Sequence, residues 1–293
     1  LVTQNLVSGK MKLSQIELVE EIRRLKKEKN AIILAHHYQR LEVQKIADFL
    51  GDSLQLAQEA TRVENDIILF CGVRFMAETA KLLNPQAKVL LSNDKSGCPL
   101  ADKINKEQLI NFKAQYPGAK VICYVNSSLE TKSESDICCT SSNAVKIVES
   151  FEPTEKLLFV PDKNLGTFAK NITARDIVVW QGYCNVHECF ISIEDVKKAK
   201  HDFPDYKILI HPECNPTIYP FADLISSTKG IIDFAEKNDI VIIGTEIGVY
   251  DQLKDRFPDK KIELLSKNAI CRNMKLTSLE DVYYSLKEEK NPI

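Results

Sequence analysis

Hydrophobic and polar positions along the chain follow two rhythms. Over 14–25 the apolar residues recur on one face of a helix, and the segment opens with a capping box from Ser14 to Glu17. The continuous apolar run 31–35 predicts a buried strand, and the helical spacing over 42–50 predicts a second helix. Short apolar runs then alternate with amphipathic stretches, which favours a parallel α/β fold.

This alternation contains an internal repeat. The apolar runs 66–72, 156–161 and 239–244 are each followed by an amphipathic segment, a second apolar run and a cysteine. The second runs cover 88–91, 176–180 and 261–265. The spacings of the cysteines are 184 − 98 = 86 and 271 − 184 = 87, and the residues are Cys98, Cys184 and Cys271.

The repeat extends upstream of these runs. Strand-like segments begin at 31, 121 and 206, and each leads to a hydroxyl cluster that contains Ser53, Ser141 or Thr228. These residues are 141 − 53 = 88 and 228 − 141 = 87 positions apart. A period near 87 is too long for a solenoid repeat and predicts three small α/β domains of similar build. Such domains can pack around a pseudo-threefold axis, where their equivalent positions meet.

Three equivalent cysteines near such an axis would offer three thiolates to one site. Thiolates select zinc or iron–sulfur clusters, and a structural zinc site normally has four protein ligands. Three thiolates without an obvious fourth favour a cubane cluster with one exposed iron, which can act as a Lewis acid. The alternative is three buried apolar thiols, which the matched spacing disfavours.

Polar residues follow the first strand of each repeat. Because the carboxyl ends of parallel strands line the binding crevice, these residues predict acid–base groups and carboxylate binders there. They are His36-His37-Tyr38, Tyr124-Val125-Asn126 and His211-Pro212-Glu213. The hydroxyl clusters predict anion binding at helix N-termini, with ordinary capping as the alternative for each one. His187, three residues after Cys184, either joins the site or orients its loop.

Composition narrows the choice of partners. The chain has 293 residues, 27% of them charged, and a formal net charge of −2. We therefore expect no nucleic-acid partner and no anionic membrane surface. The apolar runs are too short to span a bilayer. Nine cysteines, an odd number, without a recognisable secretory signal indicate a reducing compartment, the cytoplasm, rather than a disulfide framework. For the vicinal pair Cys138-Cys139 we favour a structural role over a redox role.

An ordered set of motifs resembles the bacterial and archaeal quinolinate synthases. The motifs are AHHYQ at 35–39, GDSLQLA at 51–57, SGCPLADK at 96–103, YVNSS at 124–128, SDICCTSSNA at 135–144, GYCNVHE at 182–188, HPEC at 211–214, SSTKGI at 226–231 and CRNMK at 271–275. The chain departs from the family in two places. Arg272 replaces the proline that often follows the last cysteine, and a C-x-x-C-x-x-C run found near the end of some members is absent from this sequence.

The resemblance implies three Rossmann-like αβα domains around a pseudo-threefold axis. We expect an N-terminal segment and helix over 1–30, a first domain over 31–104 against which 272–293 pack, a second over 105–190 and a third over 191–271. The implied activity is condensation of iminoaspartate with dihydroxyacetone phosphate to quinolinate, with release of phosphate and water, in NAD biosynthesis. An aspartate-oxidising enzyme is the expected functional partner, as the source of iminoaspartate.

The resemblance also implies roles for residues. One [4Fe–4S] cluster per chain is expected on Cys98, Cys184 and Cys271. The implied catalytic residues are Glu213, Tyr38, Tyr124 and His36. The implied substrate-binding residues are His36, Tyr38, Ser53, Tyr124, Asn126, Ser141, His187, His211, Glu213, Ser227 and Thr228.

Two other functions remain open at this point. A phosphosugar isomerase or aldolase without metal would use the same α/β scaffold and would turn over after chelation and exposure to air. A sensor that carries zinc or a cluster would bind its ligand tightly without forming a product.

Overall fold

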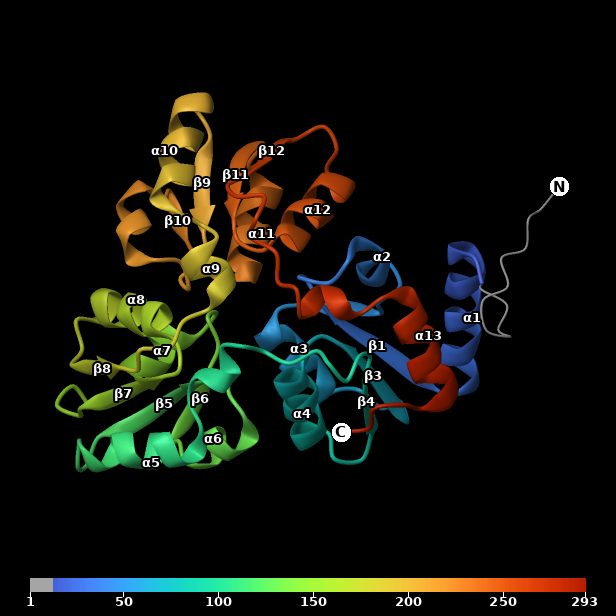
Figure 1. Ribbon diagram of the computed structural model, residues 1–293, viewed down its shortest axis with the longest axis horizontal. Coiled ribbons are helices and arrows are strands. Elements are labelled where there is room, and N and C mark those ends of the chain that lie inside the picture. Colours follow the sequence, from blue (N-terminus) through green and yellow to red (C-terminus); the bar gives the residue numbers. More distant parts are fainter. Residues whose placement is uncertain (1–12) are drawn as a thin grey trace.

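Three sheets organise the protein. The computed structural model describes residues 13–293, so the part of the predicted segment 1–30 before residue 13 lies outside the described residues. Figure 1 shows three units, each a sheet with its helices, placed around a common centre. Each sheet has four parallel strands in the spatial order second, first, third, fourth. This confirms the predicted α/β fold of three similar αβα units.

The first unit has helices on both faces of its sheet. One face packs on helices at the two ends of the chain, and the other on the helices between its own strands. Its strands are β1 (Ala31–His36), β2 (Phe49–Gly51), β3 (Ile67–Cys71) and β4 (Lys88–Leu91). Its helices are α1 (Gln15–Glu28), α2 (Leu41–Gln44), α3 (Ser53–Ala60), α4 (Arg74–Leu83) and α13 (Leu279–Glu288).

The second unit repeats this plan. Its sheet separates two apolar clusters, one under α7 and α8 and the other under α5. Its strands are β5 (Lys120–Tyr124), β6 (Ile137–Cys139), β7 (Leu157–Val160) and β8 (Ile177–Val179). Its helices are α5 (Lys106–Ala114), α6 (Leu129–Ser133), α7 (Ala144–Glu149) and α8 (Lys163–Thr173).

The third unit also has helices on both faces of its sheet. Residues of α10 pack on one face of the sheet, and those of α11 and α12 on the other. Its strands are β9 (Lys207–Ile210), β10 (Leu224–Ile225), β11 (Ile240–Gly244) and β12 (Lys261–Leu264). Its helices are α10 (Ile193–Asp202), α11 (Thr228–Lys237) and α12 (Ile247–Arg256), and α9 (Asn185–Cys189) leads in from the second unit.

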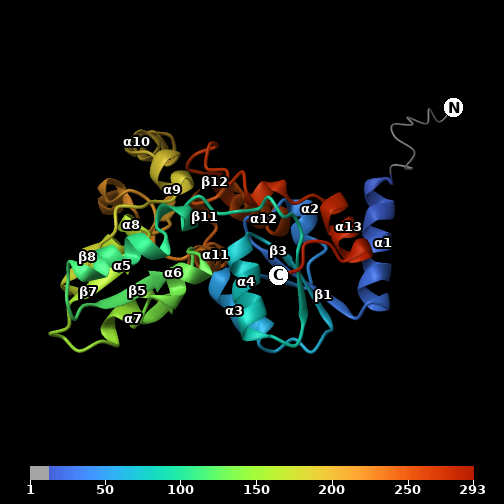
Figure 2. The ribbon, with the colours of Figure 1, turned by 60° about the horizontal axis from the view of Figure 1, so that its bottom comes forward.

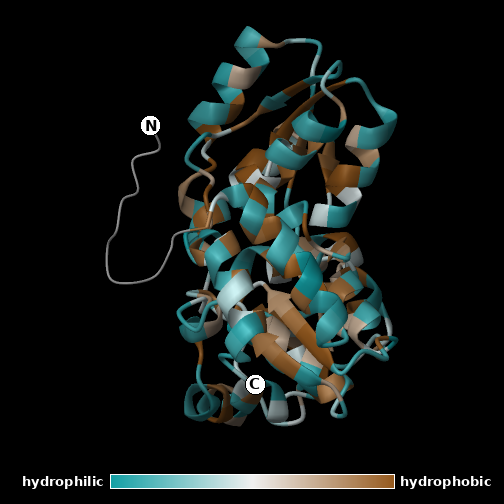
Figure 3. Cartoon of the chain, turned by 90° about the vertical axis from the view of Figure 1, so that its right-hand side faces the viewer, coloured by the Kyte–Doolittle hydropathy of each residue, from teal (hydrophilic) through white to brown (hydrophobic). Residues whose placement is uncertain are grey.

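The hydropathy pattern explains the layering. The inner strands are continuously apolar, as in β3 and β7, where every residue is buried. In Figure 3 strands of the sheets are brown, and the helices around them are largely teal on the outside. A strand buried on both faces is typical of a parallel sheet covered by helices. The carboxyl ends of the first and third strands therefore remain the places where polar side chains can gather.

One aspartate marks the same position in each unit. Asp48, Asp136 and Asp223 each lie just before the edge strand, and each carboxylate accepts a hydrogen bond of 2.8 Å from a backbone N–H of the first strand. The donors are Ile33, Val121 and Ile208. Each aspartate N–H also donates back to the carbonyl of the same residue, at 2.8 to 3.0 Å. This pair of hydrogen bonds fixes the register of the edge strand.

The predicted helix over 42–50 is wrong. Only Leu41–Gln44 is helical, and Phe49–Gly51 form the edge strand β2. The apolar residues that produced the helical spacing are buried for another reason, since Val43 and Ile46 pack into the core beside α1. Asp48 pairs with Ile33 through both its backbone and its carboxylate, so the chain becomes extended instead of continuing the helix.

The two ends of the described chain meet on the first unit. Helix α13 packs along α1, and both views show them side by side at its outer edge (Figures 1 and 2). After α13 the chain joins β4, where Leu91 N–H donates to Asn291 and Ile293 N–H donates to Val89. We keep the predicted domain limits, 31–104, 105–190 and 191–271, as a proposal.

Candidate active site

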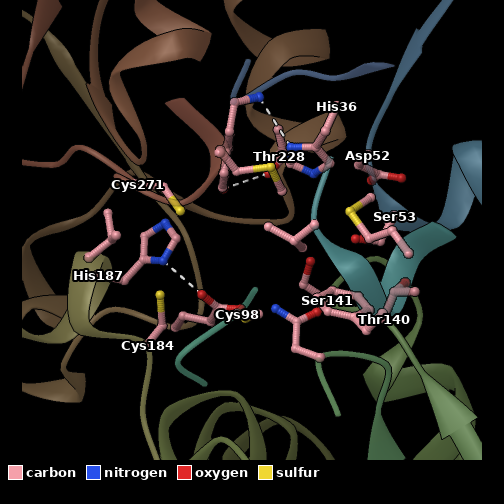
Figure 4. A pocket seen from close by; sticks show the side chains of 18 of the residues that line it. His36, Asp52, Ser53, Cys98, Thr140, Ser141, Cys184, His187, Thr228 and Cys271 are labelled. Atoms are coloured by element: carbon pink, nitrogen blue, oxygen red, sulfur yellow. Dashed lines mark hydrogen bonds and ion pairs between the residues drawn. The ribbon is translucent and has the colours of Figure 1, made fainter. Parts of the chain in front are cut away.

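One cavity lies where the three units meet. Its lining encloses about 650 Å³ of space, part of which is open to solvent. Every site residue predicted from the sequence lines it except Ser227. The lining also contains an apolar wall of Val73, Phe75 and Met76 from the first unit. Figure 4 shows Cys184, His187 and Cys271 along one side, and Ser53, Thr140 and Ser141 on the other.

The three repeated cysteines reach this cavity from three different loops. Cys98 follows β4, Cys184 follows β8 and Cys271 follows β12. Burial raises the pKa of the Cys98 thiol to about 12 and that of Cys271 to about 11, and it raises the pKa of Cys184 well above its ordinary value. Backbone N–H groups of the following turn oppose this effect at each sulfur. They belong to Leu100 and Ala101, to His187, and to Asn273 and Met274.

Two of the cysteine loops are held by buried carboxylates. Asp162 accepts from Cys184 N–H at 3.1 Å and also caps α8. Glu246 accepts from Cys271 N–H at 3.0 Å and from Gly248 N–H at 2.7 Å at the start of α12. Burial raises the pKa of both carboxyls. Each carboxylate thus ties the loop that carries a cysteine to the end of the neighbouring strand.

Lys275 extends this arrangement to the first unit. Its ammonium group lies 3.1 Å from Glu246 Oε2 and donates to the carbonyl of Tyr38 at 2.6 Å. It also donates to the carbonyl of Gln39 at 3.2 Å. The loop after Cys271 is therefore fastened to both the third and the first unit.

The donor set fits a cluster with an open position. Three thiols, one from each unit, face one cavity, and no fourth cysteine is among the residues that line it. Thiolate ligands must lose their protons on metal binding, so the raised pKa values make binding release protons. A second group of potential ligands, Cys184, His187 and Glu213, has donor atoms within 4.8 Å of one another. There, His187 Nδ1 already lies 2.7 Å from Glu213 Oε2.

Two histidines occupy equivalent positions in the first and third units. The Nδ1 atom of His36 accepts from Tyr38 N–H at 3.1 Å, and that of His211 accepts from Glu213 N–H at 3.3 Å. This contact fixes the tautomer, so each ring carries its hydrogen on Nε2. Burial lowers the pKa of His36 well below its ordinary value and that of His211 to about 3. Both rings are neutral N–H donors to the cavity, and His211 Nε2 lies 3.2 Å from Ser141 Oγ.

Glu213 is a buried carboxyl group at the centre of the site. Burial alone raises its pKa, but the nearby His187 and His211 and the hydrogen bond from Tyr124 outweigh that effect and lower it to about 2. Tyr124 OH donates to Glu213 Oε1 at 2.6 Å across the boundary between the second and third units. Burial and the negative charge of Glu213 raise the pKa of Tyr124 well above its ordinary value. Glu213 is thus a carboxylate and Tyr124 a neutral phenol.

Tyr38 reaches from the first unit into the third. Its hydroxyl lies 2.9 Å from Thr228 Oγ1 and 2.9 Å from Thr245 Oγ1. Burial raises its pKa well above the ordinary value, so the phenol keeps its hydrogen. Thr245 also contacts His187 Nε2 at 2.9 Å.

The hydroxyl clusters differ from one another more than the repeat predicts. Ser53 begins α3, but the capping is done by Asp52. Thr228 begins α11, and Ser227 caps that helix by accepting from Gly230 N–H. Ser227 does not line the cavity, so its position agrees with the capping alternative.

Ser141 does not begin a helix, contrary to the expectation for the hydroxyl clusters. It stands in the turn between Thr140 and Asn143, and α7 starts at Ala144. The turn forms because Asn143 Oδ1 accepts from Thr140 N–H at 2.7 Å. The neighbouring Ser142 donates to Asp52 Oδ2 at 2.7 Å and so links the second unit to the first.

Asn126 has free hydrogen-bonding capacity. Its amide oxygen is buried and has no hydrogen-bond partner among the described residues. A buried polar atom without a partner is costly, so such an atom beside a cavity indicates a ligand contact. Asn126 comes from the second unit, at the position equivalent to Tyr38 and Glu213.

Sequence reasoning missed several residues of the site. Asp52, Thr140, Asp162, Thr245 and Glu246 belong to no strand-end triplet and no cysteine motif. A signal for three of them was present, because Asp162, Thr245 and Glu246 directly follow the third strand of a repeat. The same place in the first unit holds Gly72 and Val73, so the pattern there is not conserved between units.

The fold and the site together define a three-unit α/β enzyme whose cavity is lined by side chains from all three units. A family model described as Quinolinate synthetase A protein matches residues 20–293. The chain therefore belongs to the quinolinate synthase family.

Individual relatives agree with this assignment. A quinolinate synthase of Alkaliphilus metalliredigens is 49% identical over 96% of this chain and 93% of its own length. Those of Caldicellulosiruptor saccharolyticus and Clostridium kluyveri are each 50% identical, over 92% and 94% of this chain and 89% and 91% of their own lengths. A solved E-1-hydroxy-2-methyl-but-2-enyl-4-diphosphate reductase from Plasmodium falciparum covers 94% of both chains, with 14% identity and a TM-score of 0.35, too low to support an inference.

No helix within residues 13–293 has the length and apolar character that a membrane span requires.

Proposed function

We propose that the chain condenses iminoaspartate with dihydroxyacetone phosphate to form quinolinate, with release of phosphate and water, in NAD biosynthesis. Family membership supports the activity, since the relatives are quinolinate synthases. The observation that carries the proposal for this site is the convergence of three thiols, one from each unit, on a cavity that also holds two N–H-donating imidazoles and a carboxylate.

Cys98, Cys184 and Cys271 would hold one [4Fe–4S] cluster. When bound, a cluster with three protein ligands supplies a Lewis acid at its fourth iron. The backbone N–H groups that face the sulfurs support thiolate ligands, because they stabilise negative charge. The loops of Cys184 and Cys271 are held in place by Asp162 and Glu246.

The substrates are anions, and the cavity offers neutral donors to them. The Nε2–H groups of His36 and His211 can donate to carboxylates, and a hydrogen bond to an ionised acceptor is stronger than a neutral one. The hydroxyls of Ser53, Ser141 and Thr228 and the amide of Asn126 complete a set of binders for carboxylate and phosphate oxygens. Ser227 contributes through α11 rather than directly.

Glu213 is the proposed general base. It is ionised in the empty site, and an anionic substrate placed beside it raises the pKa of a carboxylate toward the range of an effective base. Tyr124 donates a hydrogen bond to this carboxylate, and Tyr38 OH contacts Thr245 Oγ1 in the same site. These two phenols are the proposed proton donors, while His187 orients Glu213 from the other side.

Two further proposals concern the surroundings of the reaction. All nine cysteines are free thiols, which supports a reducing compartment such as the cytoplasm. Iminoaspartate must come from oxidation of aspartate, so we propose functional coupling to an aspartate-oxidising enzyme.

An anaerobic assay tests the function. Purified protein is given dihydroxyacetone phosphate and iminoaspartate formed in place by an aspartate-oxidising enzyme, and quinolinate is measured. We expect turnover by the native chain and none by Cys184→Ser, which should also lose its brown colour. Cys189→Ser is the matched control, because Cys189 is exposed on the same helix, and it should keep both.

Two results would favour the other functions. Full turnover by protein without a cluster would favour an isomerase or aldolase that needs no metal. Tight binding of these substrates without any product would favour a sensor.

A further inference from the structure

Thr245 holds a buried hydroxyl that no predicted motif contains. It follows β11 and is fully buried. Its Oγ1 lies 2.9 Å from Tyr38 OH and 2.9 Å from His187 Nε2. Thr245 thus contacts a phenol from the first unit and an imidazole from α9.

These contacts belong to a longer row of polar side chains in contact with one another. On one side His187 Nδ1 lies 2.7 Å from Glu213 Oε2, and Tyr124 OH donates to Glu213 Oε1 at 2.6 Å. On the other side Tyr38 OH lies 2.9 Å from Thr228 Oγ1. Thr245 is the link between the part of the row that contains Glu213 and the part that contains Tyr38.

The Thr245 hydroxyl can serve both neighbours at once. A hydroxyl has one hydrogen and two acceptor positions, so its oxygen can hydrogen-bond with the Tyr38 phenol and with the His187 imidazole together. Its place between the two rings therefore holds Tyr38 and His187 in fixed positions relative to each other.

The hydroxyl is specific to one unit. The pairing of the first and third strands aligns Cys71 with Val160 and Gly244, so Gly72 and Pro161 are the equivalents of Thr245. Neither residue has a polar side chain. The third unit, which supplies Glu213, is thus the one that carries a donor at this place.

We propose that Thr245 is a positioning residue that holds the Tyr38 phenol and the His187 ring in place beside Glu213, so that Tyr38 and Glu213 act together. The expected effect of Thr245 on turnover rests on the proposed function. The positioning of Tyr38 and His187 concerns only side chains of this protein and can be tested without substrate or cluster.

The His187 ring gives a direct readout. The chain has five histidines, few enough for each to be assigned in a ¹⁵N-histidine spectrum of the cluster-free protein. Thr245→Val replaces the hydroxyl by a methyl group and removes the contact to Nε2 of His187, so the Nε2 signal of His187 should shift by more than those of His36 and His211. An unchanged Nε2 signal of His187 in Thr245→Val would overturn the proposal.

Turnover of the cluster-loaded enzyme gives the second readout. Thr245→Val should lower kcat by about 10- to 100-fold, the range of a lost orientation in the active site, with KM changed much less. Thr245→Ser restores the hydroxyl and should recover most of kcat. Iron content and thermal stability are measured for both variants, so that loss of folding is recognised.

The outcomes separate this proposal from the proposed function. A native chain that makes no quinolinate contradicts the function, whatever the His187 spectrum shows. A native chain that makes quinolinate, with Thr245→Val equally active or Thr245→Ser equally impaired, contradicts the role of Thr245. Combining Thr245→Val with Tyr38→Phe should cost little more than Tyr38→Phe alone, because residues that act together are not additive.

Discussion

The two ends of each sheet differ in how far their residues repeat among the three units. The inner end is the one at the cavity, and the outer end is the opposite one. Near the outer ends, Asp48, Asp136 and Asp223 make the same two hydrogen bonds to the first strand. At the inner ends the equivalent residues differ from unit to unit, apart from one pair of histidines. Counted from these aspartate contacts, His36 corresponds to Tyr124 and His211, and Tyr38 corresponds to Asn126 and Glu213. The repeated part maintains the fold, and the varied part brings different chemistry to one place.

The cysteine loops show an intermediate case. The thiol itself is repeated, but its support is not. Asp162 and Glu246 hold the loops of Cys184 and Cys271, whereas the first unit has Val73 at the equivalent position. There, Arg74 N–H donates to the carbonyl of Ser96 instead. A conserved ligand position can thus be maintained by a different local structure in each unit.

Removing the charge at the inner end should have the largest effect. Glu213→Gln keeps the shape and an acceptor for Tyr124 but removes the base. We expect kcat to fall by about 10²- to 10⁴-fold, the usual contribution of general acid–base catalysis. Steady-state rates of the cluster-loaded enzyme measure this.

Glu188→Gln is the matched control for that experiment. The Glu188 carboxylate accepts hydrogen bonds from Lys163, Asn164 and Asn215 close to the site but does not line the cavity. Its variant should stay within a few-fold of the native rate. An equal loss in both variants would mean that the inner end needs negative charge in general rather than Glu213 as a base.

Removing the repeated carboxylates should affect stability instead of chemistry. Asp136→Ala and Asp223→Ala each leave a buried backbone N–H without its acceptor, at a cost of about 1–3 kcal/mol. We expect similar falls in the apparent Tm for the two variants, with kcat of the folded protein little changed. The exposed Asp259 provides the control, and Asp259→Ala should leave Tm unchanged. A fall in only one unit would contradict the equivalence of the outer ends.

The neutral imidazole at the inner end predicts a smaller dependence on pH. Burial holds the pKa of His211 at about 3 in the folded chain, against an ordinary value of 6.5. Below pH 6.5 the unfolded chain therefore binds more protons, and stability falls as the pH falls toward 3. The expected loss is about 1 kcal/mol per pH unit.

This loss is measured on cluster-free protein between pH 6.5 and 5, above the range in which Glu213 titrates. His211→Gln should flatten the decline in Tm with acid. His201→Gln should not, because His201 is exposed. An unchanged decline in His211→Gln would show that His211 is not the group that binds the proton on unfolding.

The sequence predicted the repeated features well and the local ones poorly. The period near 87 predicted the three sheets, and the strand-end residues and cysteines do meet at one cavity. The edge strands β2, β6 and β10 were missed, because two or three residues show no periodicity. The predicted helix over 42–50 failed for the same reason.

The supporting groups of the site could not be read from local pattern. Thr245, Asp162 and Glu246 act through contacts with residues distant in the sequence, such as Tyr38 and Cys271. Ser227 and Thr228 look alike in the sequence, yet Ser227 caps α11 while Thr228 faces the cavity. Which hydroxyl turns inward depends on where the helix begins.

The central claim is that three units deliver one thiolate each to a single cluster. Iron and acid-labile sulfide, counted together with the absorbance spectrum of anaerobically purified protein, test it most directly. We expect about four irons and four sulfides per native chain, and loss of both in Cys98→Ser, Cys184→Ser and Cys271→Ser. A full cluster retained in all three variants, or bound zinc in place of iron in the native chain, would contradict it.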